Sequence, residues 1–424
     1  MRIISWASIR RIACIIGFPI LLILGAIFLR GCARQRIAAV ESNLRSHISD
    51  IGSRDITRTT HLEGEILGNP WPAYLEALSA VPTSADAVEI LSRLAEGELG
   101  EDLFKIEKII TEHSLCLDAL YLGARNSRPT YPYDWIPTST SFTFRLDTFR
   151  LQQLKYLCIW DSHLLFRKGM RRKAVEVLCN LALFGRDVGL CPDSSGERSG
   201  GRIILAVAAK LRTYLQSQAL DSGELSSLES AMGHLDNAIN DRSIPILVDL
   251  ANMGICLLCE ESSGKILAKG SQSRSRYDVR WGYSSSLRVS DTLLTAETWA
   301  RRALSAERLD WKTAREEYNK IADEVGRWKE PIVRMALGSL DINRAISARI
   351  IRANVRLLRI GSRFLRTGEV LALNDPFGHK MAYLVSGMGG LKIWSVGENG
   401  ENESGDEEGD GTTKDDIVLV IRKS

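Results

Sequence analysis

RIIRANVRLLRIGSRFLR, residues 349–366, repeats arginine every three or four positions beside an equally regular series of apolar residues. This spacing matches the 3.6-residue turn of an α-helix, so each series falls along one side of the same helix. The basic face consists of Arg349, Arg352, Arg356, Arg359, Arg363 and Arg366. The apolar stripe consists of Ile346, Ile350, Ala353, Leu357, Ile360 and Phe364. The pattern predicts an amphipathic helix with a buried apolar stripe next to its arginines.

The basic face needs a counter-charge, because no acidic residue occurs between Asp341 and Glu369 and neighbouring guanidinium groups repel one another. The simplest interpretation is a solvated face whose long side chains cover apolar neighbours. The alternatives are an anionic partner: a lipid surface, a nucleic acid, or the acidic C-terminal segment of the same chain. The net charge of +3 over 424 residues gives no general argument for nucleic-acid binding.

Helical spacing recurs from about residue 33 to residue 366, with few alternating, strand-like runs. The predicted helices include 151–166 and 172–188, joined by Lys168-Gly169-Met170, and then 203–218, 222–240 and 244–260. The composition, 45% hydrophobic and 25% charged, is typical of a globular protein. We predict a mainly α fold in which residues 33–366 form either an irregular helical bundle or a body of helical hairpins of the tetratricopeptide kind.

The N-terminal region contains an 18-residue run without a charge, from Ile12 to Leu29, after a short basic tail at residues 1–11. A helix of this length spans roughly 27 Å, enough to cross the hydrocarbon of a bilayer. The run also fits the apolar region of a secretory signal, but Arg30 directly before Gly31-Cys32 disfavours cleavage there. We therefore predict an uncleaved, single-pass anchor in a bacterial inner membrane, with the bulk of the chain on the periplasmic, extracytoplasmic side.

Residues 367–424 differ from the body, because turn residues, short apolar runs and a glycine-rich acidic loop replace the helical spacing. Residues 381–385, 391–396 and 417–421 are predicted strands of a small antiparallel β module. Residues 398–416 contain nine carboxylates and one lysine. Such a loop either stays solvated or surrounds a hard cation such as Ca²⁺ with oxygen ligands. Its spacing does not match the twelve-residue EF-hand loop.

This C-terminal segment resembles the tail of the major pseudopilin of type II secretion systems. The resemblance rests on Asp375-Pro376-Phe377-Gly378, a strand with Tyr383, a strand ending in Ser395-Val396-Gly397-Glu398-Asn399-Gly400, and Asp415-Asp416-Ile417 after the acidic loop. It implies a structural calcium site in which Asn399 replaces the turn aspartate and Asp416 is the closing aspartate. The candidate ligands are Asn399, Asp406, Asp410, Asp415 and Asp416. The chain lacks the pseudopilin's N-terminal cleavage signal, so only the tail is similar.

The whole chain resembles in its organisation uncharacterised, membrane-anchored helical proteins of planctomycete-type bacteria, which implies no activity. No zinc, nucleophile-elbow or nucleotide-binding motif occurs in the sequence. Cys256 and Cys259 form a CxxC inside an apolar helical run, where two buried thiols are expected rather than a redox pair. We therefore expect an interaction or scaffold protein with protein partners. The alternatives are an enzyme with a pocket near the proline- and aromatic-rich segment 128–137, and a cytoplasmic adaptor that uses the basic face.

Overall fold

The structure of the chain, a computed structural model, describes residues 68–95, 103–126, 147–189, 194–238, 285–327, 342–378, 380–386, 389–402 and 416–422, together with positions 35, 39 and 42. This part of the chain is mainly α-helical and ends in a three-stranded antiparallel sheet, which confirms the predicted mainly α class and the small C-terminal β module. The predicted anchor Ile12–Leu29, the segment 128–137 and the predicted helix 244–260 lie outside the described residues. None of the described helices is both long and apolar enough to cross a membrane.

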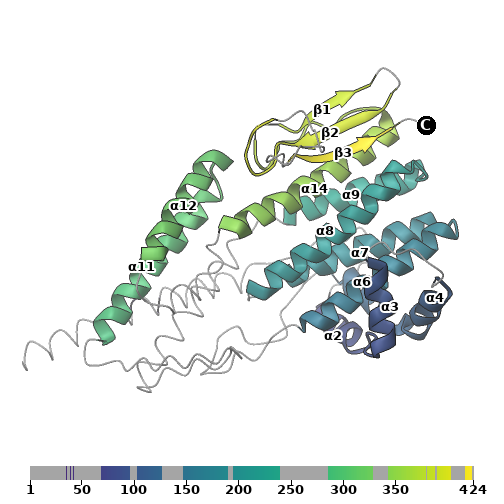
Figure 1. Cartoon of the computed structure of the whole chain (residues 1–424), viewed down its shortest axis with the longest axis horizontal. Helices are drawn as coiled ribbons and strands as arrows, with labels where there is room; N and C mark the ends of the chain where they lie inside the picture. Colours follow the sequence, from purple (N-terminus) through teal and green to yellow (C-terminus); the bar gives the residue numbers. More distant parts are fainter. Residues whose placement is uncertain are drawn as a thin grey trace, which may run out of the picture.

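The helices stack in layers on one side of the sheet. In chain order they are α2 (Trp71–Ser79), α3 (Ala85–Ala95), α4 (Leu103–Glu112), α5 (Ser114–Arg125), α6 (Thr148–Arg167), α7 (Arg171–Gly189), α8 (Ser194–Gln216), α9 (Ser222–Ala238), α11 (Ser285–Ala306), α12 (Trp311–Arg327) and α14 (Ile342–Thr367). The sheet lies on α14, and β3 also contacts α8; α9 packs against α14, and α7, α6 and the N-terminal helices follow (Figure 1). The hairpin of α11 and α12 lies to one side of this stack.

The α6–α7 pair is the helical hairpin that the sequence predicted. Asp147 begins α6, and its side chain accepts hydrogen bonds from the backbone nitrogens of Phe149 and Arg150 at 3.0 and 3.3 Å. The turn to α7 passes through Gly169, whose φ of 78° lies in the left-handed region that favours glycine. The predicted helices at 203–218 and 222–240 correspond to α8 and α9.

Glycine residues bring α7 and α8 into backbone contact. A Cβ atom on Gly200 of α8 would lie 2.2 Å from the carbonyl oxygen of Gly185 and 2.5 Å from the nitrogen of Gly189, both in α7. Since no side chain fits in this space, the two helices approach this closely only because these positions are glycine. Next to the crossing, the buried carboxylate of Asp187 accepts hydrogen bonds from Arg186 Nη2 at 2.6 Å and from the Tyr74 hydroxyl at 3.0 Å.

α14 is the predicted amphipathic helix and lies between the helical body and the sheet. Its apolar residues Ala353, Leu357 and Ile360 are buried in the main core. On the side toward the sheet, Gly361 leaves room for Leu419 and Ile421, because a Cβ atom there would lie 2.8 Å from Leu419 Cδ2. One face of the sheet therefore packs directly against α14.

The sheet consists of β1 (Ala382–Val385), β2 (Leu391–Ser395) and β3 (Ile417–Ile421), in the order β1-β2-β3. All neighbours are antiparallel, and Ile393 of β2 pairs with Tyr383 on one side and Leu419 on the other. The three predicted strands are thus confirmed to within one residue. Leu391, Ile393 and Leu419 belong to the same core as the helices, so the described part of the C-terminal module is continuous with the body.

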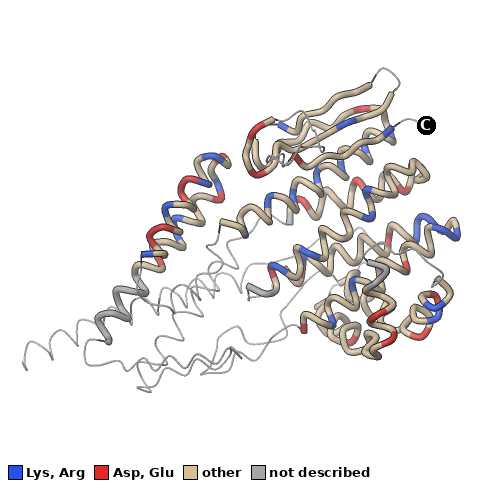
Figure 2. Tube along the Cα trace, viewed as in Figure 1, with Lys and Arg blue, Asp and Glu red and all other residues tan. Residues whose placement is uncertain are grey.

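The α11–α12 hairpin has a smaller core of its own. Trp299, Trp311 and Tyr318 are buried there together with Phe377 of the C-terminal module. Trp311 packs edge-to-face on Phe377 with ring centroids 5.6 Å apart, and its indole nitrogen donates to the carbonyl oxygen of Glu398 at 2.7 Å. Basic and acidic residues are interspersed along the described part of the hairpin (Figure 2). The C-terminal module thus contacts both the hairpin and α14.

Candidate functional site

The basic face of α14 is turned toward α9, where Asp236 is its first counter-charge. Both carboxylate oxygens of Asp236 accept from Arg356 Nε at 3.0 Å, and Arg352 Nε lies 3.9 Å from Oδ1. Arg356 also donates to the carbonyl oxygen of Asn374 at 2.6 Å. Burial lowers the pKa of Arg352 to about 10, and the neighbouring charge of Arg356 acts in the same direction. Asp236 is itself buried, so this pair is largely removed from water.

Glu229, two turns earlier in α9, is the second counter-charge. It accepts a hydrogen bond from Arg366 at 2.6 Å and lies 3.5 Å from Arg363 Nη1. Arg363 also lies 3.3 Å from Glu369, whose side chain is largely exposed. Two carboxylates at a spacing of seven residues on α9 therefore pair with four arginines on α14.

The N-terminal end of α14 is paired with other parts of the body. Arg349 lies 3.5 Å from Glu307 and stacks over the Trp311 ring at 4.6 Å, a cation–π contact. Arg344, one turn before the predicted basic face, lies 3.3 Å from Glu197 of α8. The interpretation of residues 349–366 as a solvated face is therefore wrong for this end, since the Arg349 side chain is only 7% exposed. The arginines cover apolar neighbours as expected, but they do so against carboxylates of the helical body.

Arg359 differs from the other five arginines of the basic face. It makes no hydrogen bond or ion pair within the described part of the chain, and its Nε atom is buried without a partner. Its guanidinium group lies over Gly233 of α9, where a Cβ atom would be 3.4 Å from Arg359 Cζ. Both residues line a pocket of about 300 Å³ between α9 and α14. The residues that line it, here called the Arg359 pocket, are Ser226, Glu229, Ser230, Gly233, His234, Asn237, Arg359 and Arg366.

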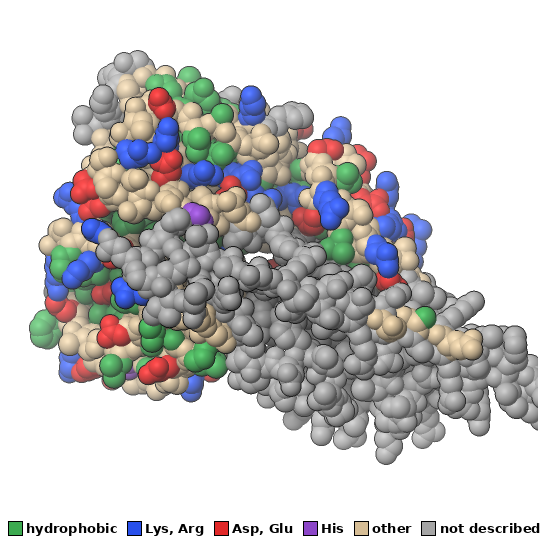
Figure 3. All heavy atoms as spheres, turned by 180° about the vertical axis from the view of Figure 1, so that it is seen from behind, with side chains coloured by type: hydrophobic (Ala, Val, Ile, Leu, Met, Phe, Trp, Pro, Cys, Tyr) green, Lys and Arg blue, Asp and Glu red, His purple; other side chains and the backbone are tan. Residues whose placement is uncertain are grey.

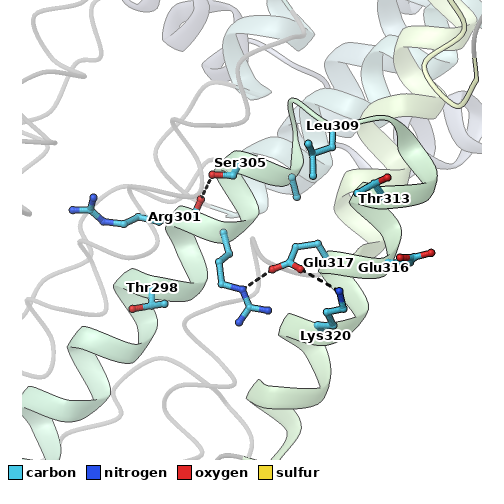
Figure 4. Close-up of a pocket in the computed structure, with 10 residues that line it drawn as sticks. Thr298, Arg301, Ser305, Leu309, Thr313, Glu316, Glu317 and Lys320 are labelled. Atoms are coloured by element: carbon cyan, nitrogen blue, oxygen red, sulfur yellow. Dashed lines mark hydrogen bonds and ion pairs between the residues drawn. The ribbon is translucent and has the colours of Figure 1, made fainter.

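A second hollow, of about 350 Å³, lies between α11 and α12 (Figure 4). Arg302 crosses it and pairs with Glu317 at 2.5 Å and Glu324 at 2.7 Å, which raises the arginine pKa. Lys320 lies 3.8 Å from Glu317. Because Arg302 lies in α11 and both of its carboxylate partners lie in α12, these ion pairs link the two helices.

The C-terminal module contains a buried carboxylate that the sequence did not identify as a site. Asp375 accepts hydrogen bonds from the nitrogens of Phe377 and Val396, at 2.9 and 2.8 Å, and from the Ser395 hydroxyl at 2.7 Å. Burial raises its pKa, and these hydrogen bonds oppose that shift. The Asp-Pro-Phe-Gly motif signalled a turn, and the structure shows that its aspartate ties that turn to the end of β2.

Two of the five candidate calcium ligands are described, and both lie at one end of the sheet. Asp416 immediately precedes β3, whose first residue pairs with Ser395, and Asn399 lies in the turn that follows β2. Asn399 Oδ1 accepts a hydrogen bond from the backbone nitrogen of Glu401 at 2.7 Å. Asp406, Asp410 and Asp415 lie outside the described residues. Among the residues that the structure describes, no three His, Cys, Asp or Glu side chains form a metal-binding group.

The outer strand β1 exposes apolar side chains. Tyr383, Leu384 and Val385 are 54, 61 and 46% exposed. Successive side chains of a strand point to opposite faces of the sheet, so β1 exposes apolar side chains on both of its faces. In Figure 3, hydrophobic side chains gather at the top of the molecule over the sheet. β1 is also an edge strand, so one row of its backbone groups has no strand partner in the described sheet.

The remaining polar groups of interest lie where α6 meets α8. Lys210 Nζ lies 3.0 Å from His163 Nδ1, so the ammonium donates to a neutral imidazole. Burial, together with the positive charges of Lys210 and Arg167, lowers the pKa of His163 to about 4. The cysteines form no separate site in the described part of the chain. Cys116, Cys158 and Cys179 are buried thiols, and Cys256 and Cys259 of the CxxC lie outside the described residues.

Comparison with known proteins gives no relative: no family model, no curated protein and no solved structure matches the chain significantly.

Proposed function

We propose that the protein is a single-pass, membrane-anchored helical interaction protein whose body lies on the extracytoplasmic side. The apolar run Ile12–Leu29 supports the anchor. The observation that carries the interaction function is β1, where three consecutive large apolar side chains are exposed on an edge strand. Natural proteins usually protect such edges with charges, proline or a covering segment, because an open edge pairs readily with another strand.

Photo-crosslinking in cells tests the interaction function. A crosslinkable amino acid at Leu384, which is 61% exposed, should give a discrete adduct with a protein partner. The matched control places the same amino acid at Phe149 of α6, which is also apolar and 45% exposed. Equal labelling from the two positions would contradict a binding role for β1.

A topology reporter tests the compartment. A reporter that is active only in the cytoplasm, fused after Ser424, should be inactive in the full-length protein. The matched control is the same fusion to a chain that lacks residues 1–30, which should be active. Activity in the full-length fusion would place the body on the cytoplasmic side.

We further propose that the acidic loop binds Ca²⁺ as a structural ion that fastens the C-terminal module. Asn399 and Asp416 bring oxygen donors to one end of the sheet, and an amide oxygen has a second lone pair beyond its bond to Glu401. Ca²⁺ should therefore raise the melting temperature of the full-length chain, because an ion that binds only the folded state stabilises it.

Two variants with opposite expected effects on the Ca²⁺-dependent shift make the calcium test specific. Asn399→Asp adds a charge to the site and should increase the Ca²⁺-dependent shift, whereas Asp416→Asn should reduce it. Mg²⁺ serves as the control ion, since it prefers a stricter octahedron and keeps several of its waters. If Ca²⁺ does not change the melting temperature of any of the three proteins, the calcium proposal is wrong.

A further inference from the structure

We propose that the Arg359 pocket binds a phosphate-type oxyanion, independently of the membrane, partner and calcium proposals above. The pocket joins three properties that the rest of the basic face does not combine. It is about 300 Å³ in volume, its central arginine has no anionic partner in the described part of the chain, and its wall is rich in hydrogen-bond donors.

The charge of the pocket favours an anion. Arg359 and Arg366 contribute two positive charges and Glu229 one negative charge, so these lining residues carry a net charge of +1. Glu229 is already engaged by Arg366 at 2.6 Å and by Arg363 at 3.5 Å, which leaves Arg359 for a ligand. A partly buried guanidinium that lacks a partner loses hydration without compensation, and a bound oxyanion restores the missing interaction.

The donors around Arg359 favour phosphate over a carboxylate. Ser226, Ser230 and Asn237 lie along the same side of α9, and each has a side-chain donor. A carboxylate has two oxygens, which the fork of one guanidinium can satisfy alone. A phosphate group has additional oxygens that can accept from the α9 side chains while the guanidinium binds from α14. Gly233 faces the guanidinium of Arg359 and has no side chain that would extend into the pocket.

The test is isothermal titration calorimetry of the full-length chain in detergent with sodium phosphate, against sodium chloride of equal ionic strength. Saturable binding of one phosphate per chain is expected. Arg359→Gln should weaken binding about tenfold or more, which corresponds to the loss of a charge-assisted hydrogen bond. Arg359→Lys keeps the charge but loses the planar fork, so it should weaken binding less.

Two further variants keep the result independent of folding defects. Arg150→Gln removes an equal charge from α6, where the side chain is 41% exposed, and should leave phosphate binding unchanged. Glu229→Gln removes the competing carboxylate from the pocket and should tighten binding roughly three- to tenfold. A gain of affinity cannot result from misfolding.

Soluble and lipid sources of the phosphate are separated by two probes. Glycerol phosphate represents the free ligand, and vesicles that contain phosphatidic acid represent the headgroup. Arg359-dependent binding of either probe supports the site and identifies its source. Phosphate binding that is absent from the wild-type chain, or that Arg359→Gln leaves intact, would overturn the proposal.

Discussion

The α7–α8 crossing and the α14–α9 contact hold the same helical body together by opposite means. At the first, glycines remove side chains so that two backbones touch. At the second, long arginines span the gap between the helices and end on Asp236 and Glu229. The glycine contact leaves no room for a Cβ atom on Gly200, whereas the ionic contact depends on the buried carboxylate of Asp236. A pocket of about 300 Å³ lies at the ionic contact, where the guanidinium of Arg359 lies over Gly233.

Gly200→Ala should have the largest effect, because it breaks the glycine contact directly. The new methyl group would lie 2.2 Å from a backbone oxygen of α7, and the backbone cannot rotate away as a side chain would. We expect the free energy of unfolding to fall by about 3 kcal/mol or more, measured by urea denaturation. The matched control is Gly326→Ala in α12, where nothing lies within 4 Å of the added Cβ. That variant should be neutral or stabilised by up to about 1 kcal/mol. Equal losses in the two variants would show that the crossing is not tightly packed.

Asp236→Ala should break the ionic contact nearly as severely. It leaves Arg356 and Arg352 without their carboxylate in a buried setting, and removing one partner of a buried pair costs about 3 kcal/mol. Urea denaturation again measures the loss. Replacing both partners, as Asp236→Leu with Arg356→Met, should recover a large part of it, since the unpaired charge is then gone. If the double variant is no more stable than Asp236→Ala, Arg352 rather than Arg356 carries the interaction.

The contact between α6 and α8 contains one charged and one uncharged group, because Lys210 donates to the neutral imidazole of His163. The pKa of His163 is lowered to about 4 in the folded chain, from an ordinary value near 6.5. Between these values the unfolded chain binds the proton more strongly, so this group destabilises the fold as the pH falls from about 6.5 toward 4. Because the histidine is only partly buried, we expect a loss of about 1 to 2 kcal/mol over that range.

The comparison with His163→Gln isolates this effect, since glutamine cannot be protonated. The difference in unfolding free energy between wild type and variant should change with pH below about 6.5 and be constant above it. A difference that stays constant between pH 4 and 8 would mean that His163 is solvated enough to titrate normally.

The sequence predicted one side of the ionic contact, and it predicted neither side of the glycine contact. The arginines of 349–366 were evident from their period, but their partners Asp236 and Glu229 are single carboxylates within an ordinary helix. Their seven-residue spacing becomes informative only when α9 is known to lie beside α14. The α7–α8 glycines were equally hidden, because isolated glycines in a helical pattern indicate a close approach but not the helix that approaches.

The C-terminal module shows the same limit in another form. The three strands followed from alternation and turn residues, both of which are local signals. The buried role of Asp375 did not, because its bond to Ser395 joins residues that only the folded turn brings together. Arg359 is a similar case: sequence placed it on the basic face, and only the paired state of its five neighbours distinguishes it.

Glu369→Gln should have the smallest effect. It compares an exposed ion pair with a buried ion pair on the same helix, α14. Glu369 pairs with Arg363 at 3.3 Å, a shorter distance than the 3.9 Å between Asp236 and Arg352. If distance determined stability, its loss should matter more than that of the Arg352 pair. Its side chain is 72% exposed, however, and water competes for both ions, so we expect a change below about 0.5 kcal/mol in urea denaturation. A loss comparable to that of Asp236→Ala would mean that burial does not control the strength of this contact, and the paired arginines of α14 would have to be ranked by distance instead.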